Sequence, residues 1–140
     1  MRIPATFLRP GIWWASVSVW FVVLFFLSSQ SKVPYTQFTF SDKIAHFGYF
    51  TLGSTAFYLA LQFQNSPPRK TFIAFLTIAF AAAVGWFDEW HQSYTPGRSG
   101  LDVADWIADI AGGIFACFVG AFLFQRFQKR AKDVARPPNP

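Results

Sequence analysis

The sequence predicts an all-α fold, a polytopic membrane protein in which four transmembrane helices form a bundle with both termini in the cytoplasm. Three observations lead to this fold class. Hydrophobic residues make up 53% of the 140 residues and charged residues only 14%, whereas soluble domains carry about 25% charged residues. The 19 Phe and 6 Trp are too many for a soluble domain of this size to bury. Four apolar stretches can cross a bilayer, and Lys and Arg concentrate on one side of the resulting topology.

The first apolar stretch covers about residues 11–29, "GIWWASVSVWFVVLFFLSS". Arg2 and Arg9 precede it, so a signal peptide is the alternative interpretation. The stretch is longer than the roughly 7–15 apolar residues of a signal peptide and lacks a clean small-x-small cleavage site. It also contains three Trp residues. We therefore expect a retained membrane helix that follows a short cytoplasmic N-terminus, residues 1–10.

The other three spans are predicted at about residues 43–63, 71–90 and 104–124. Each is close to the ~20 residues that a membrane helix needs. Pro67 and Pro68 cannot lie inside a helix, so they separate the second span from the third. The turn-forming stretch "SYTPGRSG" separates the third span from the fourth.

These spans define one membrane domain, residues 11–124. Residues 125–140 are expected to form a basic cytoplasmic tail, and its end, "KRAKDVARPPNP", is polar and rich in Pro. Such a composition favours a loose segment over a packed one.

The charges predict the orientation of the bundle. The two termini and the second connection share one side, which holds nine Lys and Arg and one acid, a net charge of +8. The opposite side holds three Lys and Arg and six acids, a net charge of −3. Since Lys and Arg accumulate on the cytoplasmic side, we expect a bacterial inner-membrane protein whose acidic side faces outward. Membrane insertion and anionic lipids explain the basic side, so the pI of about 9.7 does not indicate nucleic-acid binding.

The second span begins with polar residues that belong to the acidic side. Asp42 and His46 are four residues apart and share one face of a helix, next to Lys43. An acid in the first turn suits the helix dipole, and Ser41 or Asp42 can cap the helix. A cap does not explain His46, which lies one turn deeper.

The third span ends with the residues "DEWHQ", which supply Asp88, Glu89, His91 and Gln92. Acids at the C-terminal end of a helix oppose the helix dipole. This arrangement therefore costs stability unless another group compensates it.

The fourth span begins with three acids on one face. Asp102, Asp105 and Asp109 follow the spacing i, i+3 and i+7, and Asp109 is expected about 10 Å deeper than Asp102 at a rise of 1.5 Å per residue. A carboxylate at that depth is costly and usually indicates function. The alternative is that the deep acids only form ion pairs with Arg98 or Lys43.

Small residues along the helices predict close packing below these polar ends. Gly112, Ala116 and Gly120 have the small-xxx-small spacing that allows helices to approach closely. Gly85 in the third span and Gly48 and Gly53 in the second offer matching small residues. This packing would draw the polar helix ends together.

Six acids on the acidic side face three cations, and clustered carboxylates cannot all remain ionised without positive charge. Protonated His46 and His91, neutral carboxyl groups or a bound cation would each relieve this. The residue types also suit a divalent metal. No segment has a dedicated metal-binding spacing, so no cofactor and no firm metal site are predicted, and a divalent cation remains an option.

These motifs resemble the VanZ-like family of small bacterial integral membrane proteins over about residues 28–120. The matching motifs are an "SSQ" end to the first span, Asp-Lys-x-x-His-Phe, Asp-Glu-x-x-Gln, Pro-Gly-Arg and Asp-x-x-x-Asn/Asp-x-x-Gly. In this chain they are Ser28, Ser29 and Gln30; Asp42, Lys43, His46 and Phe47; Asp88, Glu89 and Gln92; Pro96, Gly97 and Arg98; and Asp105, Asp109 and Gly112. Asp109 takes the Asp variant of a position that is often Asn. The founding member of the family is associated with resistance to the glycopeptide teicoplanin.

The leading hypothesis is a protein that binds a cell-envelope ligand at the acidic side: a lipid-linked wall precursor, a lipid headgroup or a glycopeptide. Membrane lipids are the other expected partners, and nucleic acid is not one. An acidic surface favours cationic groups or a metal-bridged anion over a bare phosphate. The candidate ligand-binding residues are Asp42, Lys43, His46, Asp88, Glu89, His91, Gln92, Arg98, Asp105 and Asp109.

Two alternatives remain open beside binding. In the first, the protein is an enzyme that acts on an envelope lipid headgroup, with His46 or His91 as general base and Arg98 stabilising an anionic transition state. No nucleophilic Ser motif or metal triad supports it, so binding without catalysis is favoured. In the second, the polar residues form an interhelical network with a purely structural or assembly role. Transport is disfavoured because polar groups near one end offer no continuous path across the membrane.

Overall fold

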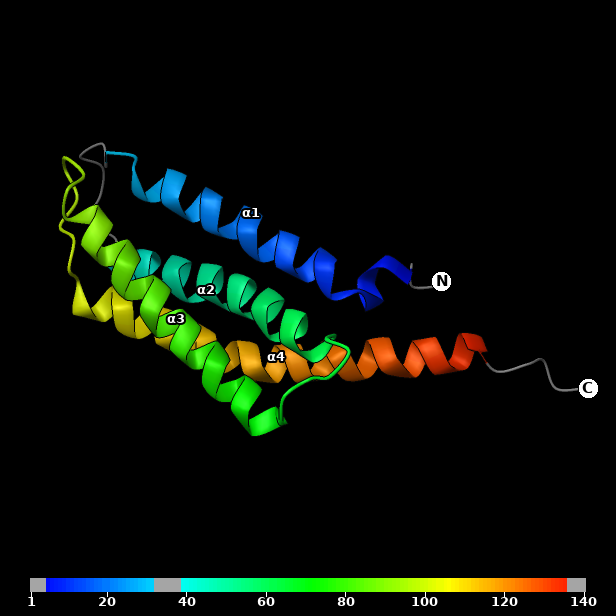
Figure 1. Cartoon of the computed structure of the whole chain (residues 1–140). Helices are drawn as coiled ribbons and strands as arrows, with labels where there is room; N and C mark the ends of the chain where they lie inside the picture. Colours follow the sequence, from blue (N-terminus) through cyan, green and yellow to red (C-terminus); the bar gives the residue numbers. More distant parts are fainter. Residues whose placement is uncertain (1–4, 32–38, 136–140) are drawn as a thin grey trace, which may run out of the picture.

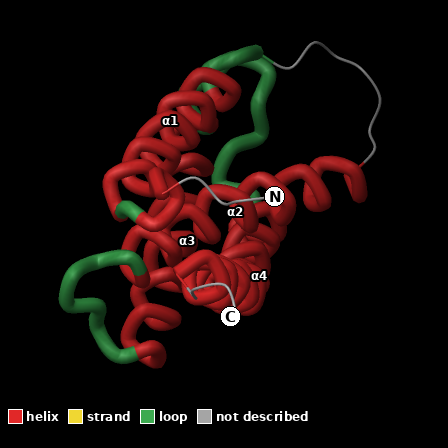
Figure 2. The backbone as a smooth tube through the Cα atoms, turned by 90° about the vertical axis from the view of Figure 1, so that its right-hand side faces the viewer, coloured by secondary structure: helices red, strands yellow, loops and turns green. Residues whose placement is uncertain are grey.

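The computed structural model describes residues 5–31 and 39–135, which form helices and connecting loops without a strand (Figures 1 and 2). This confirms the all-α prediction. A short 3-10 helix, η1 (Ala5–Leu8), precedes four α-helices. They are α1 (Pro10–Ser28), α2 (Thr39–Gln62), α3 (Lys70–Gln92) and α4 (Val103–Ala135). The predicted spans begin and end within a few residues of these helices, except that α2 begins earlier and α4 ends later than predicted.

Three of the described helices, α1, α3 and α4, are long and apolar enough to cross a membrane. Helix α2 has 24 residues but is not among them, so its membrane crossing stays a prediction. It contacts all three other helices and lies between α1 and α4 (Figure 1). Because its neighbours cover much of its surface, α2 can carry more polar side chains than a helix that faces lipid.

The boundaries of α4 follow from local chemistry. Asp102 is its N-cap, since the Asp102 carbonyl accepts the first intrahelical bond from Trp106 (3.1 Å) and its Oδ1 accepts from the Ala104 N–H (2.8 Å). Just before it, Gly100 and Leu101 both have positive φ, 55° and 52°. The chain therefore turns sharply into α4 from the connection at residues 93–102.

Helix α4 continues beyond the expected end of the membrane domain. The prediction of a loose segment from residue 129 differs from the structure, in which the helix extends to Ala135. Two causes explain this: Gln, Arg, Lys and Ala are good helix formers, and Phe127 packs against Phe63 and Trp13 with ring centroids 6.1 and 5.9 Å apart. Residues 136–140 lie outside the described part of the chain.

The centre of the bundle is built around Trp20. This side chain is 5% exposed and packs against Tyr49 and Phe50 with ring centroids 5.4 and 5.3 Å apart. Its Nε1 donates to the Tyr49 carbonyl (2.9 Å), and the Tyr49 hydroxyl donates to the Trp20 carbonyl (2.9 Å). This reciprocal pair fixes α1 on α2 while leaving both polar groups satisfied.

Glycines set the distance between α4 and its neighbours, as their spacing predicts. A Cβ on Gly112 would lie 2.5 Å from the Phe47 carbonyl oxygen of α2, and one on Gly120 would lie 2.5 Å from the Tyr58 ring. A Cβ on Gly113 would lie 2.4 Å from Ala81 of α3. Gly48 differs from expectation, because a Cβ there would meet no described atom within 4 Å.

The difference between Gly112 and Gly48 gives a direct test of this packing. Gly112→Ala is expected to lower the free energy of unfolding by about 1–3 kcal/mol, because the Phe47 backbone cannot rotate away from the added methyl group. Gly48→Ala is the matched control on α2 and should be neutral or stabilising. Thermal unfolding of both variants in one detergent measures the difference. Equal losses in the two variants would argue against close α2–α4 contact.

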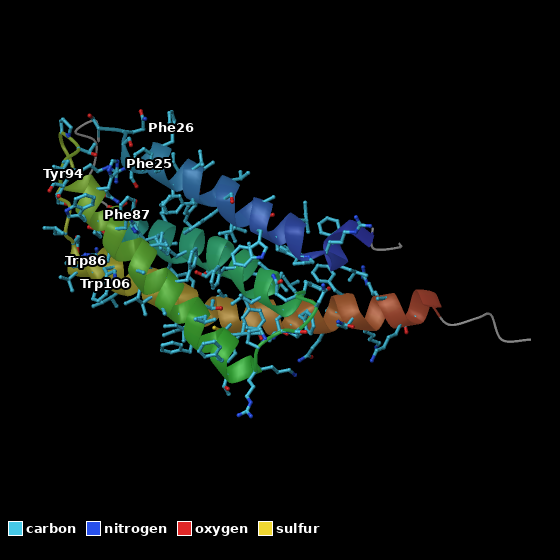
Figure 3. All side chains as sticks on the ribbon, in the orientation of Figure 1. Phe25, Phe26, Trp86, Phe87, Tyr94 and Trp106 are labelled. Carbon is cyan, nitrogen blue, oxygen red and sulfur yellow. The ribbon has the colours of Figure 1, made fainter. Side chains whose placement is uncertain are left out.

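Aromatic side chains gather at the end of the bundle where α3 joins α4. Figure 3 shows Phe25, Phe26, Trp86, Phe87, Tyr94 and Trp106 there. Trp86 and Tyr94 are 55% and 71% exposed, and the Trp106 Nε1 donates to the Ala82 carbonyl (2.8 Å). Exposed aromatic rings of this kind are typical of a membrane–water interface. Helix η1 and the last turns of α4 lie at the opposite end (Figure 1).

Candidate functional site

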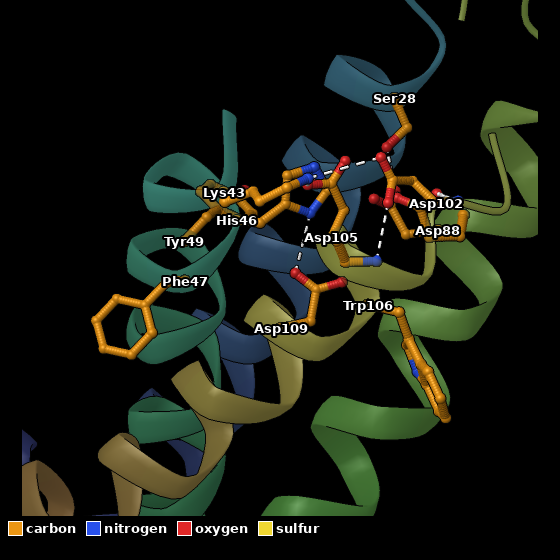
Figure 4. A network of polar contacts seen from close by, with 12 residues as sticks. Ser28, Lys43, His46, Phe47, Tyr49, Asp88, Asp102, Asp105, Trp106 and Asp109 are labelled. Atoms are coloured by element: carbon orange, nitrogen blue, oxygen red, sulfur yellow. Dashed lines mark hydrogen bonds and ion pairs between the residues drawn. The ribbon is translucent and has the colours of Figure 1, made fainter. Parts of the chain in front are cut away.

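All four helices contribute polar side chains to the end of the bundle that carries the aromatic residues. The close view in Figure 4 shows side chains from separate helices facing one another. They are Ser28 of α1, Lys43 and His46 of α2, Asp88 of α3, and Asp105 and Asp109 of α4. The predicted convergence of α2, α3 and α4 is therefore present, and α1 joins it.

Asp88 links α3 to α1. It is 3% exposed, and both of its carboxylate oxygens are paired. The Ser28 hydroxyl donates to Oδ1, and the Gln92 Nε2 donates to Oδ2 (2.8 Å). Thr95 adds a further link by donating its hydroxyl to the Ser28 carbonyl (3.1 Å). These bonds compensate the unfavourable position of an acid near the C-terminal end of α3.

Arg98 completes the same link. An ion pair of Arg98 with Asp105 or Asp109 was one alternative that the sequence left open, but Arg98 binds the end of α1 instead. Its Nη2 donates to the Leu27 carbonyl (3.1 Å) and its Nε to the Gln30 carbonyl (3.3 Å). Its Nη1 donates to the Gln92 Oε1 (3.1 Å). A cation at the C-terminal end of a helix suits both the unpaired carbonyls and the dipole.

Lys43 pairs with the start of α4. Its Nζ lies 2.8 Å from the Asp105 Oδ1 and 3.6 Å from the Asp102 Oδ2. Asp105 is 6% exposed. The hydrogen bond from the Ala104 N–H to the Asp102 carboxylate lowers the pKa of Asp102, and the positive charge of Lys43 lowers it further. The ion pair with Lys43 that the sequence suggested for a deep acid of α4 is thus present at Asp105.

His46 pairs with the deepest acid. Its Nδ1 lies 3.0 Å from the Oδ1 of Asp109, which is fully buried. Gly85 of α3 makes room for this carboxylate, since a Cβ there would lie 2.6 Å from the Asp109 Oδ2. That Oδ2 has no hydrogen-bond partner among residues 5–31 and 39–135.

Glu89 lies beside the acids of α4. It is 2% exposed, and its Oε2 accepts from the Asp102 N–H (2.7 Å). Within the described residues its Oε1 has no hydrogen-bond partner. We call this Oε1 and the Asp109 Oδ2 the two open oxygens. Buried polar atoms are nearly always paired, so each unpaired carboxylate oxygen requires an explanation.

The polar residues therefore form two groups of different character. The first, which we call the α1 link, joins α1 to the α3–α4 corner and has its carboxylate fully paired; it comprises Ser28, Asp88, Gln92, Thr95 and Arg98. The second, which we call the carboxylate cluster, contains both open oxygens; it comprises Lys43, His46, Glu89, Asp105 and Asp109. Three of its members, His46, Glu89 and Asp105, could hold a metal ion.

Two predicted site residues lie outside these groups. His91 contacts α1: the Ser29 Oγ is 3.0 Å from its Nε2, and the Phe25 ring stacks on it at 4.4 Å. Asp42 is half-buried in the first turn of α2, one turn before His46. Thr95 was missed entirely, and Ser28 was indicated only by the "SSQ" motif of the resemblance.

Comparison with known proteins assigns the chain to a family. A family model described as VanZ/LLP1 matches residues 13–125, which include all residues of both groups. Comparison with curated proteins and with solved structures found no match.

Proposed function

The chain belongs to the VanZ/LLP1 family of membrane proteins, and we propose that it binds a cell-envelope ligand at the carboxylate cluster. The ligand is a lipid-linked wall precursor, a lipid headgroup or a glycopeptide. The observation that carries the proposal is the pair of open oxygens, on Glu89 and Asp109, which are 2% and 0% exposed.

The contrast between the two groups supports binding over a purely structural role. In the α1 link, each carboxylate oxygen of Asp88 accepts a hydrogen bond. In the carboxylate cluster, Glu89 and Asp109 each present one oxygen that no described residue satisfies. An unpaired buried polar atom costs about 1–3 kcal/mol. Two buried carboxylate oxygens without a partner therefore favour a binding site, which retains such groups for its ligand, over a network built only for stability.

The charge of the cluster supports a particular ligand chemistry. Three carboxylates, of Glu89, Asp105 and Asp109, lie beside Lys43 and His46. A bare phosphate would be repelled by such a set, whereas an ammonium group or a metal-bridged anion would be attracted. Amine-bearing headgroups, wall precursors and glycopeptides satisfy this requirement. Resistance to a glycopeptide such as teicoplanin would be one consequence of binding it.

The proposed location is the cytoplasmic membrane with the cluster facing outward. The exposed aromatic residues near the cluster support an interface at that end. The nine Lys and Arg expected on the other side support a cytoplasmic position for both termini.

Catalysis is a second candidate because of one contact. The Asp109 carboxylate, 3.0 Å from the His46 Nδ1, would orient the imidazole as a general base towards a lipid headgroup. Turnover of envelope lipids by the purified protein, lost in His46→Ala, would favour this function over binding alone. His91→Ala is the matched control, because His91 contacts α1.

The binding proposal predicts a ligand-induced rise in thermal stability that depends on Glu89. The purified protein is tested with teicoplanin, with a lipid-linked wall precursor and with phosphatidylethanolamine. A ligand at 100 times its Kd should stabilise the protein by about 2.7 kcal/mol. Glu89→Gln removes the negative charge and should abolish this shift, whereas the exposed Asp133→Asn should keep it. The proposal would be contradicted if none of the three compounds stabilised the wild type. It would also be contradicted if Glu89→Gln were stabilised as much as the wild type.

A further inference from the structure

We propose that the carboxylate cluster binds one divalent metal ion, held by an imidazole nitrogen of His46 and by one carboxylate oxygen each of Glu89 and Asp105. This inference deepens the proposed function. It rests on that function in one respect, because the envelope ligand would supply the anionic group that the metal ion binds. The metal itself is measured independently of that ligand.

The three donor atoms are already close together. One ligand atom from each of His46, Glu89 and Asp105 lies within 4.8 Å of the other two. Metal–ligand bonds of about 2.0–2.2 Å place neighbouring ligands about 3–4 Å apart. The three donor atoms are therefore close to the separations that a bound ion requires.

A buried carboxylate oxygen without a partner provides a second, independent reason. The Glu89 side chain is 2% exposed, and its Oε1 is open among the residues that the structure describes. Its other oxygen is held by the Asp102 N–H (2.7 Å). The carboxylate is therefore held in place by one oxygen, while its second oxygen faces no hydrogen-bond donor of the described residues. Such an oxygen is available to bind a metal ion.

The other two ligands are also oriented by a neighbour. Asp109 lies 3.0 Å from the His46 Nδ1, which leaves Nε2 for the ion. Lys43 binds the Asp105 Oδ1 (2.8 Å), which leaves Oδ2. Metal-binding His residues characteristically pair their second ring nitrogen with a carboxylate or carbonyl, and these partners strengthen binding. Asp109 occupies that position here.

The donor set indicates which ions fit. One imidazole nitrogen with two carboxylate oxygens suits Zn²⁺ or Mn²⁺ better than Mg²⁺ or Ca²⁺, which prefer oxygen alone. Three protein ligands leave at least one coordination position open. An anionic headgroup could fill that position, so the ion would reconcile an acidic cluster with an anionic envelope ligand.

The test measures the metal alone. Full-length protein in detergent is stripped with a chelator, dialysed against Zn²⁺ or Mn²⁺, and analysed for metal content per chain. We expect one ion per wild-type chain and a loss of at least tenfold in affinity in Glu89→Gln, Asp105→Asn and His46→Ala. His91→Ala is the matched histidine control and Asp133→Asn the matched acid control, and both should bind like the wild type.

Co²⁺ substitution gives a spectroscopic check that does not depend on affinity. Wild-type protein should show visible ligand-field bands that change in His46→Ala and not in His91→Ala. Thermal unfolding without metal identifies any variant that simply fails to fold, and Asp105→Asn and Glu89→Gln then carry the test. Binding that is absent, far from one ion per chain, or equal in His46→Ala and the wild type overturns the proposal.

The outcomes separate this inference from the proposed function. In the first outcome, metal binds, but teicoplanin, the wall precursor and phosphatidylethanolamine leave the thermal stability unchanged. The metal site is then kept and the envelope ligand is rejected. A shift from one of these compounds in metal-free protein, with no metal bound, rejects the metal site and keeps the ligand.

Discussion

Replacing His46 with leucine is expected to destabilise the protein by about 3 kcal/mol, because it leaves a buried carboxylate without its partner. Asp109 is fully buried, and His46 is the residue that pairs with its Oδ1 at 3.0 Å. The variant should unfold at a lower temperature than the wild type in the same detergent. His91→Leu is the control, since His91 stacks on the Phe25 ring and a leucine can replace much of that contact.

The double substitution His46→Leu with Asp109→Leu should reverse this loss. Replacing a buried ion pair by apolar residues is often neutral or stabilising by about 1–4 kcal/mol. The double variant should therefore unfold at or above the wild-type temperature while binding neither envelope ligand nor metal. Such a result would show that the cluster is kept for function at a cost in stability. A double variant less stable than His46→Leu would instead assign the cluster a structural role.

Arg98→Ala should destabilise the protein by about 3 kcal/mol, since three exposed or half-buried hydrogen bonds are lost together and a typical hydrogen bond contributes about 0.5–1.5 kcal/mol. The lost acceptors are the carbonyls of Leu27 and Gln30 and the Oε1 of Gln92. Arg98→Lys should recover less than half of the loss, because one ammonium group cannot reach acceptors that the planar guanidinium reaches together. Thermal unfolding in one detergent compares the variants.

Arg126→Ala is the matched control for Arg98. The Arg126 guanidinium lies 4.9 Å from the Phe122 ring centroid, and loss of such an exposed cation–π contact costs about 0.5–1 kcal/mol. If Arg98→Ala were no more damaging than Arg126→Ala, the link between α1 and the α3–α4 corner would contribute little to stability.

Much of the fold could be predicted because its signals are local. Apolar runs, Pro67 and Pro68, and the Gly-containing connection place the helices. The i, i+3 and i+7 spacing correctly puts Asp102, Asp105 and Asp109 at one end of α4. The end of α4 was predicted too early, because a polar composition does not reveal that Phe127 packs against Phe63 and Trp13.

The pairing of the polar residues could not be predicted in the same way. Spacing along one helix gives the face that a residue occupies, but its partner depends on the rotation and axial offset of the neighbouring helix. Contacts such as Gly85 against Asp109 set that offset. Arg98 therefore binds α1 and not Asp109, and the open oxygen of Glu89 became visible only once the helices were placed together.

The attachment of Arg98 to α1 also constrains the order of assembly during synthesis. Leu27 and Arg98 are separated by 71 positions, so the first helix emerges from the ribosome long before the residue that completes its end. Until the third helix and the following corner have been translated, the carbonyls at the end of α1 must be satisfied by water or by lipid headgroups. The C-terminal end of the first helix is therefore completed only when the last helix begins to form, whereas the Trp20–Tyr49 hydrogen bonds can join α1 to α2 as soon as both helices are present.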